Sequence, residues 1–257
     1  MNSRENYIAL TTIVRKEVVR FMRIWSQTLL PPVITQTLYF VIFGKFIGSQ
    51  VAGISGVTYM QFIVPGLVMM AIITNSFANV VSSFFGSKFQ RSIEELMVSS
   101  TPNWVIVLGF TLGGVVRGIS VGILVFLVSM FFTAPHIHHF GFIILFVALT
   151  AVLFSLAGLL NGIFAKKFDD VSIFPTFVLT PLTYLGGVFY SIHSLPAIGQ
   201  NLSKLNPVLY MIDGFRYGFY GISDVSVLMS VMILIMFIAI LISLNLYLLE
   251  KGIGLKS

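Results

Sequence analysis

The sequence predicts an all-α integral membrane protein with six transmembrane helices, folded as a single transmembrane domain over residues 1–257. Its 257 residues are 57% hydrophobic and only 9% charged, whereas about 25% of residues are charged in a soluble globular protein. Six apolar runs each approach or exceed the roughly 20 residues that a helix needs to cross the hydrocarbon core. They cover about 29–47, 58–86, 103–132, 140–165, 171–190 and 225–249.

The basic residues alternate between the two sides of these runs. Eleven of the 15 lysines and arginines lie before the first run, between the second and third, between the fourth and fifth, or after the sixth. Lys and Arg near span ends stay on the cytoplasmic side, so the pattern predicts a multi-pass protein with both termini in the cytoplasm. The eleven residues are Arg4, Arg15, Lys16, Arg20, Arg23, Lys88, Arg91, Lys166, Lys167, Lys251 and Lys256.

Composition and charge exclude several classes of protein. The net charge is +6, but the charges flank membrane runs and do not form one basic face, which argues against nucleic-acid binding. The chain has no cysteine, which excludes a disulfide scaffold, a cysteine-ligated metal and a thiol nucleophile. The runs contain no arrangement typical of an enzyme and no mid-span carboxylate typical of a proton-driven transporter.

Three histidines lie close together in the short loop between the third and fourth runs. They are His136, His138 and His139. Imidazoles bind metals, but this loop adds no carboxylate or cysteine to them. We therefore assign no metal site to the chain.

Residues 7–25 are predicted to form an amphipathic helix in the membrane interface. On a helical wheel one side is apolar and the opposite side is polar and basic, the pattern of an interfacial helix. Pro31 and Pro32 then favour a turn into the first span. The helix is either a plain anchor or an elbow that cradles the bundle and meets a cytoplasmic partner. The apolar side holds Tyr7, Val14, Val18, Phe21 and Trp25, and the polar side holds Thr12, Lys16, Arg20 and Arg23.

A short helix is predicted in the loop between the second and third spans. Ser92 and Glu95 have the spacing of a capping box, which starts the helix at Ser92. Ile93, Leu96 and Met97 give it an apolar side that the loop cannot bury by itself. An exposed apolar stripe suggests docking onto another protein; the alternative is that it rests on the bilayer or on the chain's own helices.

Polar and small residues inside the spans indicate contacts between helices. Gln61, Asn75, Asn79 and Ser82 lie roughly on one face of the second span, where they either bond neighbouring helices or line a pathway. Gly114, Gly118 and Gly122 form a small-residue ladder in the third span, and we expect it to pack on the fourth. The expected partners there are Ala151, Ser155, Gly158 and Gly162.

Arg117 lies near the middle of the third span, a depth at which charged residues are rare. No Asp or Glu occupies the middle of any span, so an ionic partner is not evident. Arg117 either hydrogen-bonds carbonyls or the amides of the second span, or contacts a substrate.

The segment after the fifth span is too apolar to be a free loop. Pro175, Pro181 and the Gly186–Gly187 pair predict that the fifth span is kinked or broken. Residues 192–221 are then expected to dip back into the outer leaflet as short re-entrant helices before the sixth span, 225–249. Asn206 and Pro207 read as the N-cap and first residue of one of them.

This segment carries a resemblance to a known family. A glycine-rich end of the fifth span followed by Leu195-Pro196, Leu205-Asn206-Pro207, Tyr210, Asp213 and Arg216 resembles the signature of type-2 ABC exporter permeases. The stretches MRIWSQTLLPPVITQTLYFVIFG, YMQFIVPGLVMM, SSFFGSKFQRSIEEL and FDDVSIFPTFVLTPLTYLGGVFY are similar to bacterial inner-membrane permeases of that family. The resemblance covers nearly the whole chain.

The resemblance implies a division of labour between subunits. Such permeases work as homodimers in the bacterial inner membrane, each copy paired with a separately encoded ATP-binding subunit that holds ATP and Mg²⁺. Residues 4–26 correspond to the interfacial elbow helix, 29–190 to spans one to five, and 88–101 to the coupling helix. The residues implied to couple to the ATPase are Arg91, Ser92, Ile93, Glu94, Glu95, Leu96 and Met97.

Residues 192–221 correspond to the family's outer re-entrant helices, which close the exit. The implied outer-gate residues are Leu195, Pro196, Asn206, Pro207, Tyr210, Asp213 and Arg216. Asp213 and Arg216 lie three apart on one expected helix, so they could pair with each other. The pair could equally be a weak exposed one with little energetic role.

The expected function is that of a membrane permease subunit of an ATP-driven exporter. The sequence contains no G-x-x-x-x-G-K-[ST] phosphate-binding loop, so ATP hydrolysis is expected on a partner chain and no cofactor on this one. Two alternatives are a non-transporting membrane scaffold or sensor and an ATP-independent channel or carrier. The substrate stays open, because fold does not determine cargo.

Overall fold

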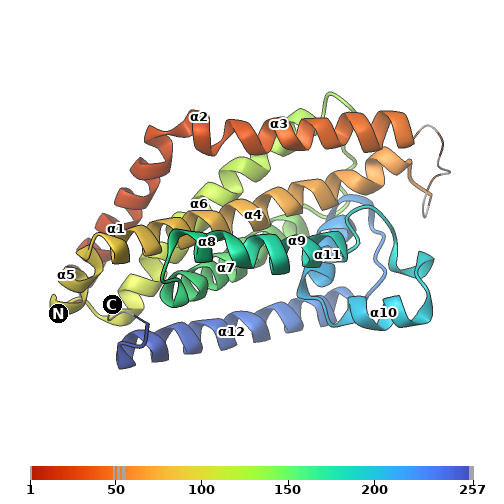
Figure 1. Cartoon of the computed structure of the whole chain (residues 1–257). Helices are drawn as coiled ribbons and strands as arrows, with labels where there is room; N and C mark the ends of the chain where they lie inside the picture. Colours follow the sequence, from red (N-terminus) through yellow and green to blue (C-terminus); the bar gives the residue numbers. More distant parts are fainter. Residues whose placement is uncertain (1, 49, 51–52, 54–55, 255–257) are drawn as a thin grey trace.

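A computed structural model describes residues 2–48, 50, 53 and 56–254. Lys256, one of the basic residues used to predict the orientation, lies outside them. The described chain forms an all-helical bundle whose long helices run roughly side by side (Figure 1). This arrangement bears out the predicted all-α class.

Four helices are long and apolar enough to cross a membrane, among the residues that the structure describes. They match the predicted second, third, fourth and sixth spans. Of the apolar window of α4, 83% is buried inside the bundle, against 11% for α12. The second span is therefore the central helix and the sixth lies at the periphery. The four helices are α4 (Tyr59–Phe89), α6 (Asn103–Ser129), α7 (Phe140–Phe164) and α12 (Val227–Lys251).

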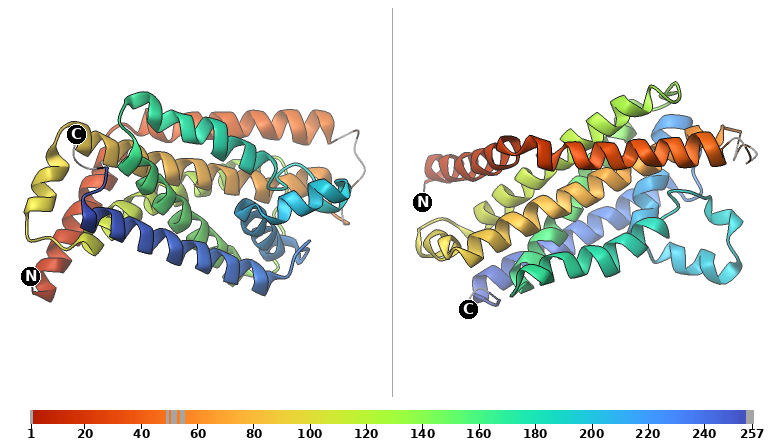
Figure 2. Two further views of the ribbon diagram at one scale, coloured as in Figure 1. Left: turned by 60° about the horizontal axis from the view of Figure 1, so that its bottom comes forward. Right: turned by 45° about the horizontal axis from the view of Figure 1, so that its top comes forward.

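The predicted first and fifth spans are built from shorter pieces. The first consists of α3 (Leu30–Tyr39) and a π-helical turn (Phe40–Ile47), and the short helix α2 (Trp25–Thr28) precedes it. The fifth consists of α8 (Phe168–Phe174), a π-helical turn (Pro175–Leu179) and α9 (Thr180–Tyr184). The helix changes from α to π at Pro175, because proline lacks the N–H that an α-helical hydrogen bond needs. This change agrees with the predicted kink or break in the fifth span. Both stretches run beside the long helices (Figure 2).

Glycines bring α6 and α7 against α4, which corrects the predicted pairing of their ladders. A Cβ atom at Gly122 of α6 would lie 2.5 Å from Ile72 of α4, and the ladder residue Gly118 faces Ser76 of the same helix. Gly158 of α7 also packs on α4, because a Cβ there would lie 2.6 Å from the Phe77 carbonyl oxygen. Both small-residue rows therefore face α4, although α6 and α7 also contact each other. Of the ladder, Gly114 alone also reaches Ser155.

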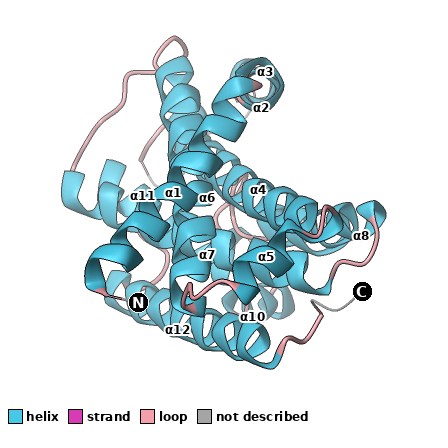
Figure 3. Cartoon of the chain, turned by 90° about the vertical axis from the view of Figure 1, so that its left-hand side faces the viewer, coloured by secondary structure: helices cyan, strands magenta, loops and turns pink. Residues whose placement is uncertain are grey.

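The bundle has two distinct ends. At one of them, here called the α5 end, lie the start of α1 (Ser3–Arg23), the short helix α5 (Ser92–Val98) and the end of α12 (Figures 1 and 3). At the other, the α11 end, lie a 3₁₀ turn (Ile192–Ser194), α10 (Ala197–Lys204) and α11 (Pro207–Tyr220). The predicted coupling and gating residues therefore lie at opposite ends of the molecule.

Candidate functional site

Helix α5 begins at Ser92, as predicted, but not through a capping box. Ser92 is the first helical residue and not the cap; its hydroxyl donates to the Ser87 carbonyl at 3.2 Å. The cap position is held by Arg91, whose φ of 59° is left-handed. This conformation is uncommon for a residue with a side chain. It reverses the chain sharply between α4 and α5.

The apolar side of α5 is packed on the chain's own helices, which corrects the predicted exposed stripe. Ile93 is 1% exposed and lies in a cluster with Phe84 of α4 and Val105 of α6. Leu96 and Met97 pack at the edge of the same cluster. The alternative reading of the stripe is therefore the right one. The surface that α5 leaves open consists of Arg91, Glu94, Glu95 and Val98.

A buried carboxylate joins α1 to α4. Glu17 is fully buried, and its two oxygens accept from Ser83 Oγ at 2.6 Å and from Arg20 Nη2 at 3.1 Å. Arg20 Nη2 also donates to the carbonyl and side-chain oxygens of Asn79, at 3.0 and 2.9 Å. These charge-assisted bonds make a connected polar cluster between the two helices.

A row of polar residues on α4 and a glycine on α6 make room for this cluster. Lys16 Nζ lies 3.9 Å from Glu17 and donates to Ser87 Oγ at 3.3 Å. Asn79, Ser83 and Ser87 recur every four residues, so they form one row along α4. On α6, a Cβ at Gly109 would lie 2.6 Å from Ile13, so glycine permits the approach of α1.

The sequence did not predict the face by which α1 packs on the bundle. The helical wheel placed Arg20 on the polar side of an interfacial helix, and Tyr7 and Trp25 on its apolar side. In the structure Tyr7 and Trp25 are exposed and Arg20 reaches into the bundle. The i, i+4 spacing of Ile13, Glu17 and Phe21 could have indicated the buried face. The carboxylate of Glu17 argued against this choice, because a Glu is rarely buried unless it is paired.

The polar residues of the second span do not form one lining. Asn75 Oδ1 accepts from Arg117 Nη2 at 3.3 Å, and the same nitrogen lies 3.4 Å from the Thr28 carbonyl. Arg117 thus makes hydrogen bonds to a backbone carbonyl and to a side-chain amide of the second span, as expected of a structural residue. Gln61 caps the start of α4 with Thr58, and Ser82 is exposed and bonds its own helix backbone.

Lys88, which the sequence indicated only as an orientation signal, joins α4 to the end of α7. Its Nζ donates to the carbonyl oxygens of Ile163 and Ala165 at 2.8 and 2.7 Å. A cation is favoured at a helix C-terminus, where carbonyls lack partners. At the start of α8, the carboxylate of Asp170 accepts the backbone N–H groups of Lys166 and Lys167.

At the α11 end, the predicted cap of α11 is confirmed. Asn206 is the N-cap, its Oδ1 accepting from the Val208 N–H at 3.0 Å, and Pro207 is the first helical residue. Asn206 Nδ2 donates to the Leu182 carbonyl at 2.6 Å, which ties α11 to α9. Tyr210 donates its hydroxyl to the Lys204 carbonyl at 2.6 Å and so ties α11 to α10. Leu195 and Pro196 precede α10, half-buried and exposed respectively.

The expected Asp213–Arg216 pair is replaced by two separate anchors. Asp213 is 1% exposed and accepts from Ser223 Oγ at 2.8 Å and from the N–H groups of Asp224 and Val225 at 2.8 and 3.0 Å. It therefore fixes the loop that enters α12. Spacing within α11 gave no information about these donors, because they come from a later segment of the chain.

Arg216 anchors the other side of α11. It is 3% exposed, donates to the Gly187 carbonyl at 2.8 Å, and stacks its guanidinium 3.8 Å from the centroid of the Phe62 ring. The contact with Phe62 is a cation–π interaction. Through Arg216, α11 is joined to α4 and to the segment that follows α9.

Replacing Asp213 with alanine is expected to destabilise the protein by about 3 kcal/mol, because buried N–H groups that lose their acceptor cost about 1–3 kcal/mol each. Asp213→Asn keeps one acceptor oxygen in place, so we expect it to lose less than half as much. Thermal unfolding in detergent, followed by size-exclusion chromatography, measures both. If Asp213→Ala unfolds at the wild-type temperature, the anchor described above has no energetic role.

The histidine loop is held against α11. The backbone N–H groups of His138 and His139 donate to the Gly218 carbonyl at 3.1 and 2.8 Å, and the His139 ring stacks on Tyr217. These contacts give the loop a packing role. In the part of the chain that the structure describes, no group of three His, Cys, Asp or Glu residues is placed to hold a metal ion.

Comparison with known proteins connects this arrangement to a family. Residues 8–220 match the family described as ABC-2 type transporter. The chain is 59% identical over 251 residues to the inner membrane transport permease YadH of Escherichia coli K12, covering 98% of each chain. It is 23% identical over 222 residues to nodulation protein J of Rhizobium meliloti, covering 82% of this chain and 80% of that protein.

These matches confirm the resemblance found in the sequence, the transport role and the inner-membrane location. They cover the α5 region and all of α11, which lie at the two ends described above. The chain belongs to the ABC-2 type transporter family and is a permease subunit of its exporters, an integral inner-membrane protein that acts with an ATP-binding subunit.

Proposed function

We propose that the chain works as a homodimer with two ATP-binding subunits, each copy crossing the membrane six times, to move a substrate out of the cytoplasm. In this arrangement the α5 end is cytoplasmic, which places the basic residues of α1, of the end of α4, of the turn before α8 and of the end of α12 on that side. The segmented first and fifth spans complete the six crossings. ATP and Mg²⁺ belong to the partner subunit.

The observation that carries the proposal is the way in which α5 packs on the bundle. Its apolar side is fixed in the core between α4 and α6 through Ile93, while Glu94 and Glu95 face outward at the end of the bundle. A close-packed core transmits displacement. We propose that basic groups of the ATPase contact Glu94 and Glu95 and move α5 when ATP binds.

The movement then has a route through α4. The Glu17 cluster joins α4 to the elbow helix α1, and Arg216 joins α4 to α11 by its stacking on Phe62. We propose that α4 shifts as a rigid element and displaces the gate formed by residues 192–221. The energy for this step has to come from contacts that differ between the two states of the ATPase.

Replacing both Glu94 and Glu95 with alanine tests the proposal. In the complex reconstituted in nanodiscs, we expect the ATPase activity stimulated by the permease to fall about tenfold, since close interfacial charge pairs couple by at least about 1.5 kcal/mol. Glu250→Ala is the matched control, because Glu250 is also exposed and lies at the end of α12 beside the α5 end.

The outcome also separates the two other functions. A non-transporting scaffold would leave ATPase turnover indifferent to the double substitution, although the subunits would still co-purify. A channel or carrier would pass solute through vesicles that contain this chain alone. Either result contradicts the proposed coupling through α5.

A further inference from the structure

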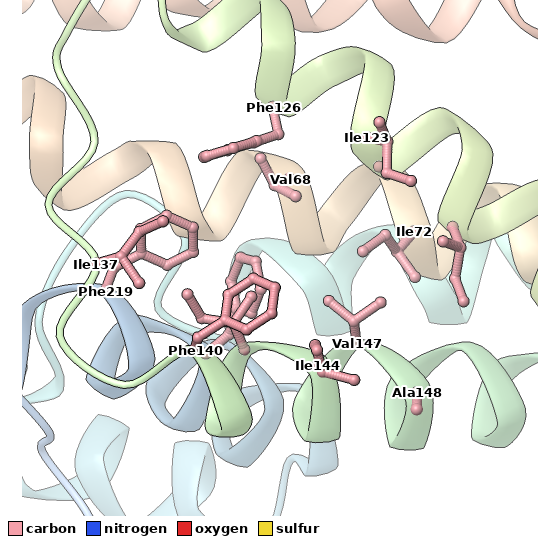
Figure 4. Close-up of a pocket in the computed structure, with 14 residues that line it drawn as sticks. Val68, Ile72, Ile123, Phe126, Ile137, Phe140, Ile144, Val147, Ala148 and Phe219 are labelled. Carbon is pink, nitrogen blue, oxygen red and sulfur yellow. The ribbon is translucent and has the colours of Figure 1, made fainter.

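A groove of about 330 Å³ opens on the side of the bundle between α6 and α7 (Figure 4). It lies in the half of the bundle nearer α11, and side chains of α4 and α11 close its inner side. The lining residues used below are Ile123, Ile137, Phe140, Ile144, Ala148, Phe215 and Phe219. Their side chains take no part in the hydrogen bonds described above.

The chemistry of the lining restricts what can occupy the groove. All the residues around it are glycine, alanine, valine, isoleucine or phenylalanine, so no side chain offers a hydrogen bond. A buried water needs two to four polar partners, which this lining does not supply. An empty groove would forfeit the dispersion contacts of its walls. The fitting occupant is therefore an apolar molecule.

The position of the groove identifies the source of that molecule. Ile123 and Ile144 are each 54% exposed and belong to long apolar helices that cross the membrane. The groove thus opens sideways toward hydrocarbon. Towards the α11 end its lining reaches Ile137 and Phe140, which flank the polar pair His138 and His139. An occupant that is apolar in the groove and polar beyond this end matches a phospholipid.

We propose that the groove binds one acyl chain of a membrane phospholipid, with the headgroup near the histidine loop. Phe215 and Phe219, both on α11, form part of the lining. A bound chain therefore stabilises the packing of α11 against α6 and α7. A second copy of this chain is a less suitable occupant, because the groove is concave and would need a protruding apolar side chain to fill it.

Photolabelling tests the assignment in the complex with the ATP-binding subunit. The complex is reconstituted in nanodiscs with a phosphatidylethanolamine that carries a diazirine in one acyl chain, irradiated, and mapped by mass spectrometry. We expect label to concentrate on Ile123, Ile144 and their neighbours in the groove. Ala148→Phe should reduce that label about tenfold, the loss of partition expected when about two methylenes are excluded.

Ala239→Phe is the matched control, since Ala239 is exposed on α12 outside the groove; it should leave the labelling unchanged. Ile144→Trp at the mouth of the groove gives a second test if Ala148→Phe fails to assemble. Equal labelling of the groove and of the exposed face of α12 would overturn the proposal, because it would show that lipid contacts the whole surface without a specific site. Label on the exposed face of α12 with none in the groove would also overturn it, as expected if another protein surface covers the groove.

Discussion

Replacing Arg20 with methionine is expected to destabilise the permease by about 3 kcal/mol, because removing one partner of a buried ion pair leaves a charge uncompensated. Glu17 is fully buried, and without Arg20 it keeps only Ser83 at 2.6 Å and Lys16 at 3.9 Å. Asn79 loses both of its bonds to the guanidinium at the same time. We expect α1 to detach from α4 at a lower temperature than in the wild type.

A double-substitution cycle measures the coupling. Glu17→Gln removes the buried charge, so the pair Glu17→Gln with Arg20→Met should lose less stability than the sum of the two single changes. Arg23→Met is the control, because Arg23 is a neighbouring arginine of α1 that is exposed. Residual folded protein after heating in detergent gives the comparison. Equal losses for Arg20→Met and Arg23→Met would show that the cluster does not hold α1 in place.

Replacing Gly158 with alanine is expected to cost about 2 kcal/mol, since inserting a methyl group into a packed helix contact forces backbone shifts. The new Cβ would lie 2.6 Å from the Phe77 carbonyl oxygen, and backbone atoms of the central helix α4 cannot rotate away as a side chain can. We expect the separation of α7 from α4 to lower the unfolding temperature and the yield of assembled complex.

The same substitution at Gly86 should have the opposite sign. Apart from its chain neighbours and the nearby backbone of its own helix, no atom of the described residues lies within 4 Å of a Cβ at Gly86, which is also helical. Alanine there removes only the entropic cost of glycine, a gain of about 0.5–1 kcal/mol. Thermal unfolding of both variants under identical conditions checks the pair. If both variants lose stability alike, close approach of the backbones is not what Gly158 provides.

The sequence predicted best those features that depend on one segment alone. Hydropathy located the helices now seen as α4, α6, α7 and α12, because length and apolar content decide whether a helix spans a membrane. The Asn206–Pro207 cap was equally local, since the bonds of an N-cap run to the next few residues. The broken fifth span followed from Pro175 for the same reason.

The features that the sequence did not predict depend on partners far along the chain. The acceptor role of Asp213 required knowing that residues 223–225 return beside α11. The buried position of Glu17 required Ser83 and the glycine at 113, both from other helices. The apolar side of α5 packs on the core of the chain because the backbone at Arg91 is left-handed and turns α5 back onto the bundle. The residue type at this position does not by itself indicate such a conformation.

The central position of α4 has a consequence for how the protein is made in the cell. Its buried polar side chains, Asn75 and Asn79, find their partners on α1 and α6. When the ribosome has released only the first two spans, Arg117 is not yet available to Asn75. The Asn75 amide nitrogen donates within α4, to the Ala71 carbonyl, but its oxygen lacks this donor in lipid until the third span leaves the translocon, whereas the peripheral α12 can join last onto a finished assembly.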